Sequence, residues 1–105
     1  MGLKVIWSTY SEERLFSIYK YYRKKVSKTV ATNLLNGIVK AGNELNTKPL
    51  IGQIEPMLIS RNETFRYTLY KSYKIIYVVY QNEGYIKIAN VFDCRRNPDK
   101  IKLTK

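Results

Sequence analysis

The sequence has no histidine and a single cysteine, Cys94, among its 105 residues. No histidine and one cysteine exclude the usual zinc sites, and without histidine Cys94 lacks the usual partner of a catalytic thiol. One cysteine forms no internal disulfide, which suits a reducing compartment, and we expect Cys94 to be a small packing residue at the end of a strand. The eight acidic residues are scattered, and there is no glycine-rich phosphate loop. We therefore expect neither a metal nor a cofactor.

Long apolar runs are also missing. No stretch approaches the roughly 20 residues that a membrane-spanning helix requires. The opening residues, MGLKVIWSTY, lack the apolar region and the cleavage pattern of a signal peptide. These absences lead us to expect a cytoplasmic protein with no membrane partner.

Positive charge is the strongest feature that is present. Nineteen Lys and Arg against eight Asp and Glu give a formal net charge of +11. A small domain this basic attracts polyanions or an acidic partner at long range. Nucleic acid, ribosomal RNA and DNA included, and an acidic protein fit equally well, so net charge alone does not choose between them.

The first half of the chain has the pattern of a short strand followed by two helices. Residues 3–7 alternate as a strand does. An apolar stripe at steps of three and four predicts a helix over residues 10–25, with Thr9 or Ser8 as its N-cap. A second stripe predicts a helix over residues 27–46. The junction is very short, so the two helices are expected to form an antiparallel hairpin.

The second half changes to a period of two. Residues 48–56, KPLIGQIEP, hold two prolines and a glycine and predict turns without regular structure. Residues 65–70 and 85–92 alternate as strands, and residues 74–80 are apolar at nearly every position, as in a central strand. A tight turn at Lys71 and Ser72 and a hairpin signal before residue 85 join the three strands into an antiparallel meander.

This order of elements predicts one α+β domain over residues 1–105, with the first strand and the helical hairpin packed on a mainly antiparallel, twisted sheet. The C-terminal residues, DKIKLTK, are expected to fray.

Four pieces of sequence carry a family resemblance. They are VIWS before the first helix, the pattern L-x-x-x-P-x-x-G at Leu45, Pro49 and Gly52, the strand YKIIYVV, and VFDCRRNPDK near the end. In this order, residues 5–101 resemble the RelE/ParE superfamily of toxins from bacterial type II toxin–antitoxin modules, most of all its ParE-like, plasmid-stabilisation branch. The resemblance implies a tight complex with a cognate acidic antitoxin, and a toxin dimer within that complex is a further expectation.

The resemblance also implies a growth-inhibiting activity when the toxin is free. RelE-like members cut messenger RNA in the ribosomal decoding site, whereas ParE-like members poison DNA gyrase; a non-toxic binding relative is a third alternative. Cleavage would use basic residues that hold the scissile phosphate, and the resemblance implies Arg66, Lys74 and Arg95 for that role, with Arg96 as a further contact to the target or to nucleic acid. We expect the sheet to gather the first three on one concave face.

Two departures from the RelE pattern count against the nuclease. Thr68 stands where active enzymes tend to carry lysine, and no tyrosine or histidine follows Arg95. A general acid or base must reach the reacting proton and titrate usefully, which lysine does poorly. The basic residues also have purely structural interpretations, such as an ion pair between Arg95 and Asp93. We therefore expect a ParE-like toxin that obstructs gyrase without autonomous catalysis.

Overall fold

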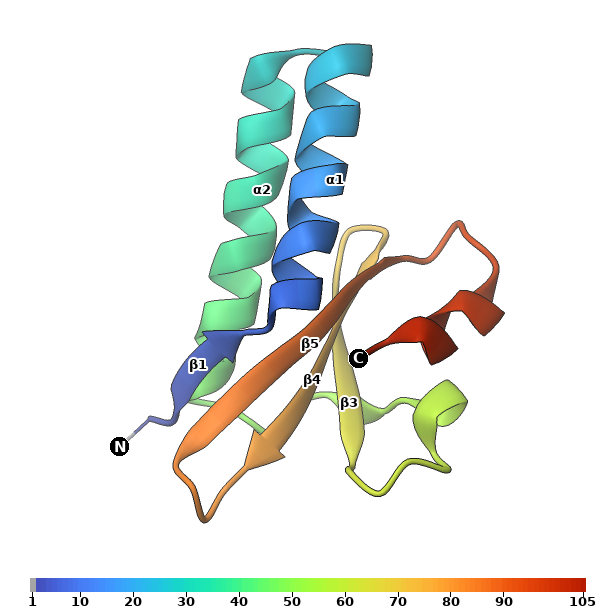
Figure 1. Ribbon diagram of the computed structural model, residues 1–105. Helices are drawn as coiled ribbons and strands as arrows, with labels where there is room; N and C mark the ends of the chain where they lie inside the picture. Colours follow the sequence, from blue (N-terminus) through green and yellow to red (C-terminus); the bar gives the residue numbers. More distant parts are fainter. Residues whose placement is uncertain (1) are drawn as a thin grey trace.

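Two helices and a five-stranded sheet make up the architecture of the computed structural model, which describes residues 2–105 (Figure 1). The α+β class predicted from the sequence is confirmed. Three short 3-10 helices, η1 (Glu44–Asn46), η2 (Pro56–Leu58) and η3 (Pro98–Leu103), complete the chain. The main elements are β1 (Lys4–Trp7), α1 (Thr9–Lys25), α2 (Lys28–Asn43), β2 (Gln53–Ile54), β3 (Phe65–Tyr70), β4 (Tyr73–Tyr80) and β5 (Tyr85–Asp93).

The helical hairpin is fixed at both helix starts by serine caps. The hydroxyl of Ser8 accepts a hydrogen bond from the backbone N–H of Ser11 (3.1 Å), and the hydroxyl of Ser27 accepts one from Val30 (3.1 Å). Because only Val26 and Ser27 separate the helices, they run antiparallel, as predicted. Figure 1 shows α1 and α2 side by side, with the turn between them projecting far beyond the sheet. None of the helices within residues 2–105 is long and apolar enough to cross a membrane.

The sheet has the strand order β1-β5-β4-β3-β2. Strands β3, β4 and β5 form the predicted antiparallel meander, and the two-residue turn pairs Tyr70 with Tyr73. Strand β1 adds parallel to β5 at one edge. Strand β2 adds antiparallel to β3 at the other edge, so the prediction that residues 48–56 contain no regular structure was wrong for Gln53 and Ile54. A pairing of two residues leaves no periodic signal in a segment rich in Pro and Gly.

Each face of the sheet has its own apolar cluster. The face toward the helices buries Tyr73, Ile75 and Tyr77 of β4 against α1 and α2. The other face buries Ile76 and Val78 of the same strand against η2 and η3. Side chains of β4 therefore alternate between two layers, which explains why this strand is apolar at nearly every position.

The C-terminal segment is ordered against the second face, so the prediction that it frays was wrong. Ile101 is buried, and the Nδ2 of Asn90 donates a hydrogen bond to the hydroxyl of Thr104 (2.8 Å). The guanidinium of Arg61 donates to the backbone oxygens of Thr104 and Lys102, both at 2.8 Å. These partners lie far away in the sequence, and a local pattern does not reveal them. The expectation for Cys94 was also wrong, because this residue is exposed after the end of β5.

Candidate functional site

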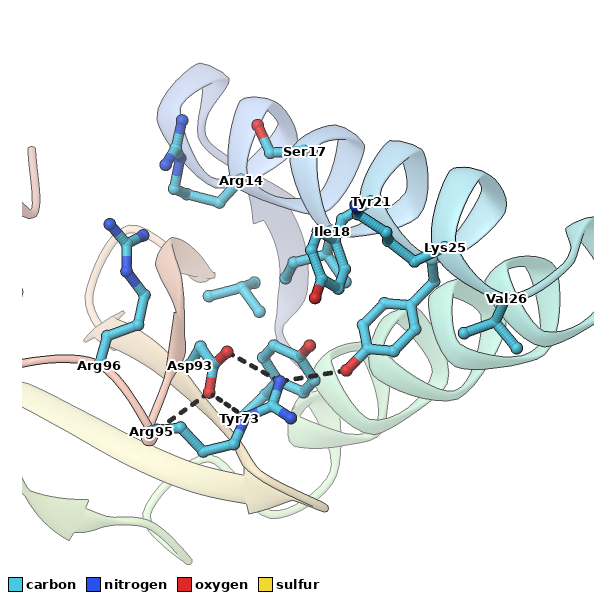
Figure 2. Close-up of a pocket in the computed structure, with 12 residues that line it drawn as sticks. Arg14, Ser17, Ile18, Tyr21, Lys25, Val26, Tyr73, Asp93, Arg95 and Arg96 are labelled. Carbon is cyan, nitrogen blue, oxygen red and sulfur yellow. Dashed lines mark hydrogen bonds and ion pairs between the residues drawn. The ribbon is translucent and has the colours of Figure 1, made fainter.

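A groove of about 600 Å³ lies between α1 and the end of β5. Figure 2 shows that side chains from both elements point into it. Four cationic side chains and one carboxylate, that of Asp93, line the groove, so its charge is positive. The lining residues are Arg14, Ser17, Ile18, Tyr21, Tyr22, Lys25, Val26, Tyr73, Val91, Asp93, Arg95 and Arg96.

Arg95 bridges the strand end to the helix across this groove. Its Nε and Nη2 donate to the two carboxylate oxygens of Asp93 (2.9 Å each), and Nη2 also donates to the hydroxyl of Tyr22 (3.1 Å). Tyr22 reaches this position because it lies on the side of α1 that packs on the apolar cluster between the helices and the sheet. The Arg95 side chain is 59% exposed, so the pair with Asp93 contributes less than ~1 kcal/mol to stability. The structural interpretation of Arg95 is thus confirmed as far as its pairing with Asp93.

Hydrogen bonds and burial shift the pKa values of three residues in the groove. Hydrogen bonding from the Arg95 guanidinium holds the pKa of Asp93 below its usual value. The pKa of Tyr22 is lowered mainly by a hydrogen bond with Tyr73 and, to a smaller extent, by one with Arg95. Burial raises the pKa of Tyr73. Asp93 therefore stays ionised and offsets Arg95, while the other cations of the groove keep their charge uncompensated.

Two of those cations are placed to receive an anion. Arg96 is exposed, and within residues 2–105 it forms no ion pair. The Nε of Arg14 is buried without a hydrogen-bond partner among the described residues, and its guanidinium lies 5.5 Å from the centre of the Tyr10 ring. Within the same residues, no group of three or more acidic or cysteine side chains is arranged to hold a metal ion. The groove is suited to acidic or phosphorylated partners.

The other two candidates, Arg66 and Lys74, lie elsewhere and have partners of their own. Arg66 donates to the backbone oxygen of Gly52 (2.9 Å) at the β2 edge of the sheet. The ammonium of Lys74 lies 2.7 Å from a carboxylate oxygen of Glu55, whose side chain is fully buried. Lys74 also lies over the ring of Tyr67, 4.2 Å from its centre.

Strand register places these two cations on opposite faces of the sheet. Arg66 pairs with Tyr77, a residue of the cluster facing the helices. Lys74 is three residues before Tyr77 on β4, so it points to the other face. The expectation that Arg66, Lys74 and Arg95 gather on one face was therefore wrong. Their part in target contact stays a prediction.

Sequence reasoning missed Arg14, Tyr22 and Glu55 as parts of these arrangements. Helical periodicity places Tyr22 on the apolar side of the first helix and Arg14 off it, which distinguishes neither from an ordinary core or surface residue. Glu55 lies 19 residues from Lys74, and its burial depends on the unpredicted strand β2. A charged residue directly before a proline in an apolar segment was the one local signal.

Comparison with known proteins identifies the family. The family model for the ParE toxin of the type II toxin–antitoxin system, parDE, matches residues 5–98. Among solved structures, the chain is similar to one described as the chromosomal ParDE TA system from P. aeruginosa, with 17% identity, a TM-score of 0.72, and coverage of 88% of this chain and 96% of that chain. That identity supports the fold alone, and no curated protein sequence matches the chain. Because the family match covers most of its length, the chain belongs to the ParE toxin family of type II toxin–antitoxin systems.

Proposed function

We propose that this protein inhibits growth by binding DNA gyrase, and that an acidic antitoxin neutralises it by covering the groove between α1 and β5. The observation that carries the proposal is the separation of the basic residues. Arg66 and Lys74 lie on opposite faces and are bound to Gly52 and Glu55. A phosphodiester cleavage site needs its cations convergent on one phosphate. A toxin that obstructs a protein needs only an exposed contact surface, such as Arg95 and Arg96 provide.

The antitoxin part rests on charge. The groove holds four cations against one carboxylate, and Asp93 is already paired with Arg95. An acidic segment that folds on binding complements such a surface and covers the contacts that the target would use. The antitoxin and the target then compete for the same residues.

Induced expression tests this proposal. The wild-type protein should arrest growth when produced alone and should be tolerated when the neighbouring gene is co-expressed. The variant R95A/R96A should lose most of its toxicity, whereas the control variant K48A/K100A, which removes two exposed lysines outside the groove, should remain toxic. Unchanged growth with the wild-type protein alone would refute the proposal.

Ribosome-dependent cleavage of messenger RNA is a second candidate, favoured by one observation. The phenol of Tyr22, whose pKa is lowered, lies 3.1 Å from the Arg95 guanidinium, so a cation and a titratable hydroxyl are adjacent. If this pair were catalytic, Tyr22→Phe would abolish cleavage of translated messenger RNA. Absence of cleavage by the wild-type protein would remove this candidate.

A further inference from the structure

Most of the helical hairpin carries positive charge with no acidic residue to offset it. Between Glu13 and Glu44 there is no acidic residue, while seven of the chain's 19 Lys and Arg lie in this interval. Five of the seven are grouped near the turn between the helices, and all five are exposed. We call these five the hairpin tip: Lys20, Arg23, Lys24, Lys25 and Lys28.

The fold keeps the hairpin tip away from compensating charge. Figure 1 shows the turn between α1 and α2 at the far end of the molecule from the sheet. Glu13 lies in the sheet-side half of α1, and Glu44 lies in η1, just after α2 ends. Asp93 lines the same groove as Lys25 but is paired with Arg95. Glu13 is seven residues before Lys20 and twelve residues before Lys25, roughly 10 and 18 Å along the helix at 1.5 Å per residue. These distances reach or exceed the Debye length of about 10 Å at 0.1 M salt, so Glu13 relieves little of the repulsion among the tip cations.

Helix stabilisation accounts for only part of this arrangement. Arg23, Lys24 and Lys25 lie in the last turn of α1, where cations favour the helix dipole. Lys28, in contrast, is the first residue of α2, where a cation opposes the dipole, and the first turn of α2 contains no acid. Within residues 2–105, none of the tip residues forms an ion pair. The charge of the tip is therefore not balanced by ion pairs within the described residues.

We propose that the hairpin tip binds the phosphodiester backbone of double-stranded nucleic acid. A convex, exposed helical turn carrying five cations reaches phosphates on a duplex without needing a deep pocket. Tyr21, 57% exposed beside these cations, adds a ring with a polar end to the same surface. The contacts are to phosphates, so binding is sequence-independent and strongly dependent on salt. This inference goes beyond the action on gyrase and the neutralisation by an antitoxin.

Fluorescence anisotropy of the full-length protein tests the proposal. The probes are labelled duplexes of about 20 base pairs, DNA and RNA of the same sequence, titrated between 50 and 300 mM salt. The test variant R23Q/K24Q/K28Q removes three tip charges without touching the residues that line the groove. The control variant K48Q/K100Q/K102Q removes three exposed charges elsewhere. Circular dichroism verifies that each variant is folded.

The tip variant should bind at least one duplex more than tenfold more weakly at 100 mM salt, while the control changes less than threefold. The slope of log affinity against log salt should fall by about 2 to 3 for the tip variant, since each lost phosphate contact contributes about 0.9. The arm that shows the larger loss, DNA or RNA, identifies the source of the backbone. Equal losses in both variants, or wild-type binding by the tip variant, would overturn the proposal.

An acidic protein partner is the competing explanation. If the tip variant binds polyglutamate more weakly than wild type but binds both duplexes normally, the tip serves a protein and the nucleic-acid proposal fails. Neither gyrase nor antitoxin is present in this assay. A negative result for nucleic-acid binding would therefore leave the proposed toxin activity untouched, because that activity is tested separately by growth.

Discussion

The ammonium nitrogen of Lys74 lies 2.7 Å from a carboxylate oxygen of Glu55, and the Glu55 side chain is fully buried. The second carboxylate oxygen of Glu55 accepts a hydrogen bond from the backbone N–H of Met57 (2.8 Å), so Glu55 also caps the N-terminus of η2. One carboxylate thus joins β4 to the segment between β2 and η2. Lys74 had been a candidate for phosphate contact, and the structure gives it a structural partner.

Removal of the Lys74 charge should strongly destabilise the fold. Lys74→Ala leaves the Glu55 carboxylate buried and uncompensated, which costs about 3–5 kcal/mol in such pairs. Urea unfolding followed by circular dichroism measures the change, with the exposed Lys48→Ala as a control near zero. The double variant K74M/E55M should recover much of the loss, because it leaves no buried charge. A loss below ~1 kcal/mol for Lys74→Ala would show that the pair does not stabilise the fold.

Gly52 should not tolerate a side chain. A Cβ there would lie 2.5 Å from the Tyr77 hydroxyl and 2.6 Å from the backbone oxygen of Tyr67. Gly52→Ala must displace both atoms, so we expect a loss of about 1–3 kcal/mol in urea unfolding. Tyr77→Phe in the same chain removes the hydroxyl and should lessen the cost of Gly52→Ala.

Gly84 offers a contrast to Gly52, since a Cβ there meets no atom within 4 Å and only its φ of +82° opposes a side chain. Gly84→Ala should cost about 1 kcal/mol, and Tyr77→Phe should leave that cost unchanged. If Tyr77→Phe shifted both costs equally, the close approach at Gly52 would not be the cause.

Lys71 marks a position where a substitution should stabilise. Its φ is 52° in the two-residue turn between β3 and β4, and it is the one non-glycine residue with positive φ among residues 2–105. Asparagine tolerates this conformation better than lysine does. We expect Lys71→Asn to raise the free energy of unfolding by ~0.5 kcal/mol after loss of the Lys71 contact with the Tyr70 ring. Ser72→Asn, without positive φ, should show no such gain.

The ion pair between Arg95 and Asp93 should give the stability a small dependence on acid pH. The folded protein holds the pKa of Asp93 below its ordinary value of 3.8. The resulting stabilisation is therefore present above pH 3.8 and is lost as the pH falls through the folded pKa. For an exposed pair the change stays below ~1 kcal/mol.

Comparison of Arg95→Gln with wild type across pH 2 to 6 tests this dependence. Arg95→Gln should lower stability above pH 4 and converge with wild type at pH 2. Arg96→Gln, whose guanidinium forms no ion pair within the described residues, should follow the wild-type curve. Parallel curves for Arg95→Gln and wild type would contradict the assignment.

Local periodicity in the sequence predicted the two helices and the longer strands. The elements that it did not predict are held by contacts with other parts of the chain. The stripes of α1 and α2 and the alternation of β3 and β5 are properties of single segments, so they were readable. The edge strand β2 and the ordered C-terminus depend on partners such as Phe65, whose backbone oxygen accepts from Glu55, and Asn90. The members of each pair belong to different elements, so the periodicity of a single segment does not reveal that they meet.

The sequence itself contained evidence against placing Arg66 and Lys74 on the same face of the sheet. A two-residue turn at Lys71 and Ser72 was predicted, and it pairs Leu69 with Lys74. Arg66 is three residues before Leu69, an odd separation, so strand alternation alone places Arg66 and Lys74 on opposite faces. The bridge from Arg95 to Tyr22 was not foreseeable, since it depends on how α1 packs against β5.

The central claim, obstruction of gyrase by a surface that includes Arg95 and Arg96, is tested most directly by supercoiling of relaxed plasmid in the presence of the purified toxin. The wild-type protein should inhibit supercoiling, R95A/R96A should require at least tenfold more protein for the same inhibition, and a reporter messenger RNA in a translating extract should remain intact. Normal supercoiling at saturating toxin, together with cleavage of the reporter within codons, would contradict the account.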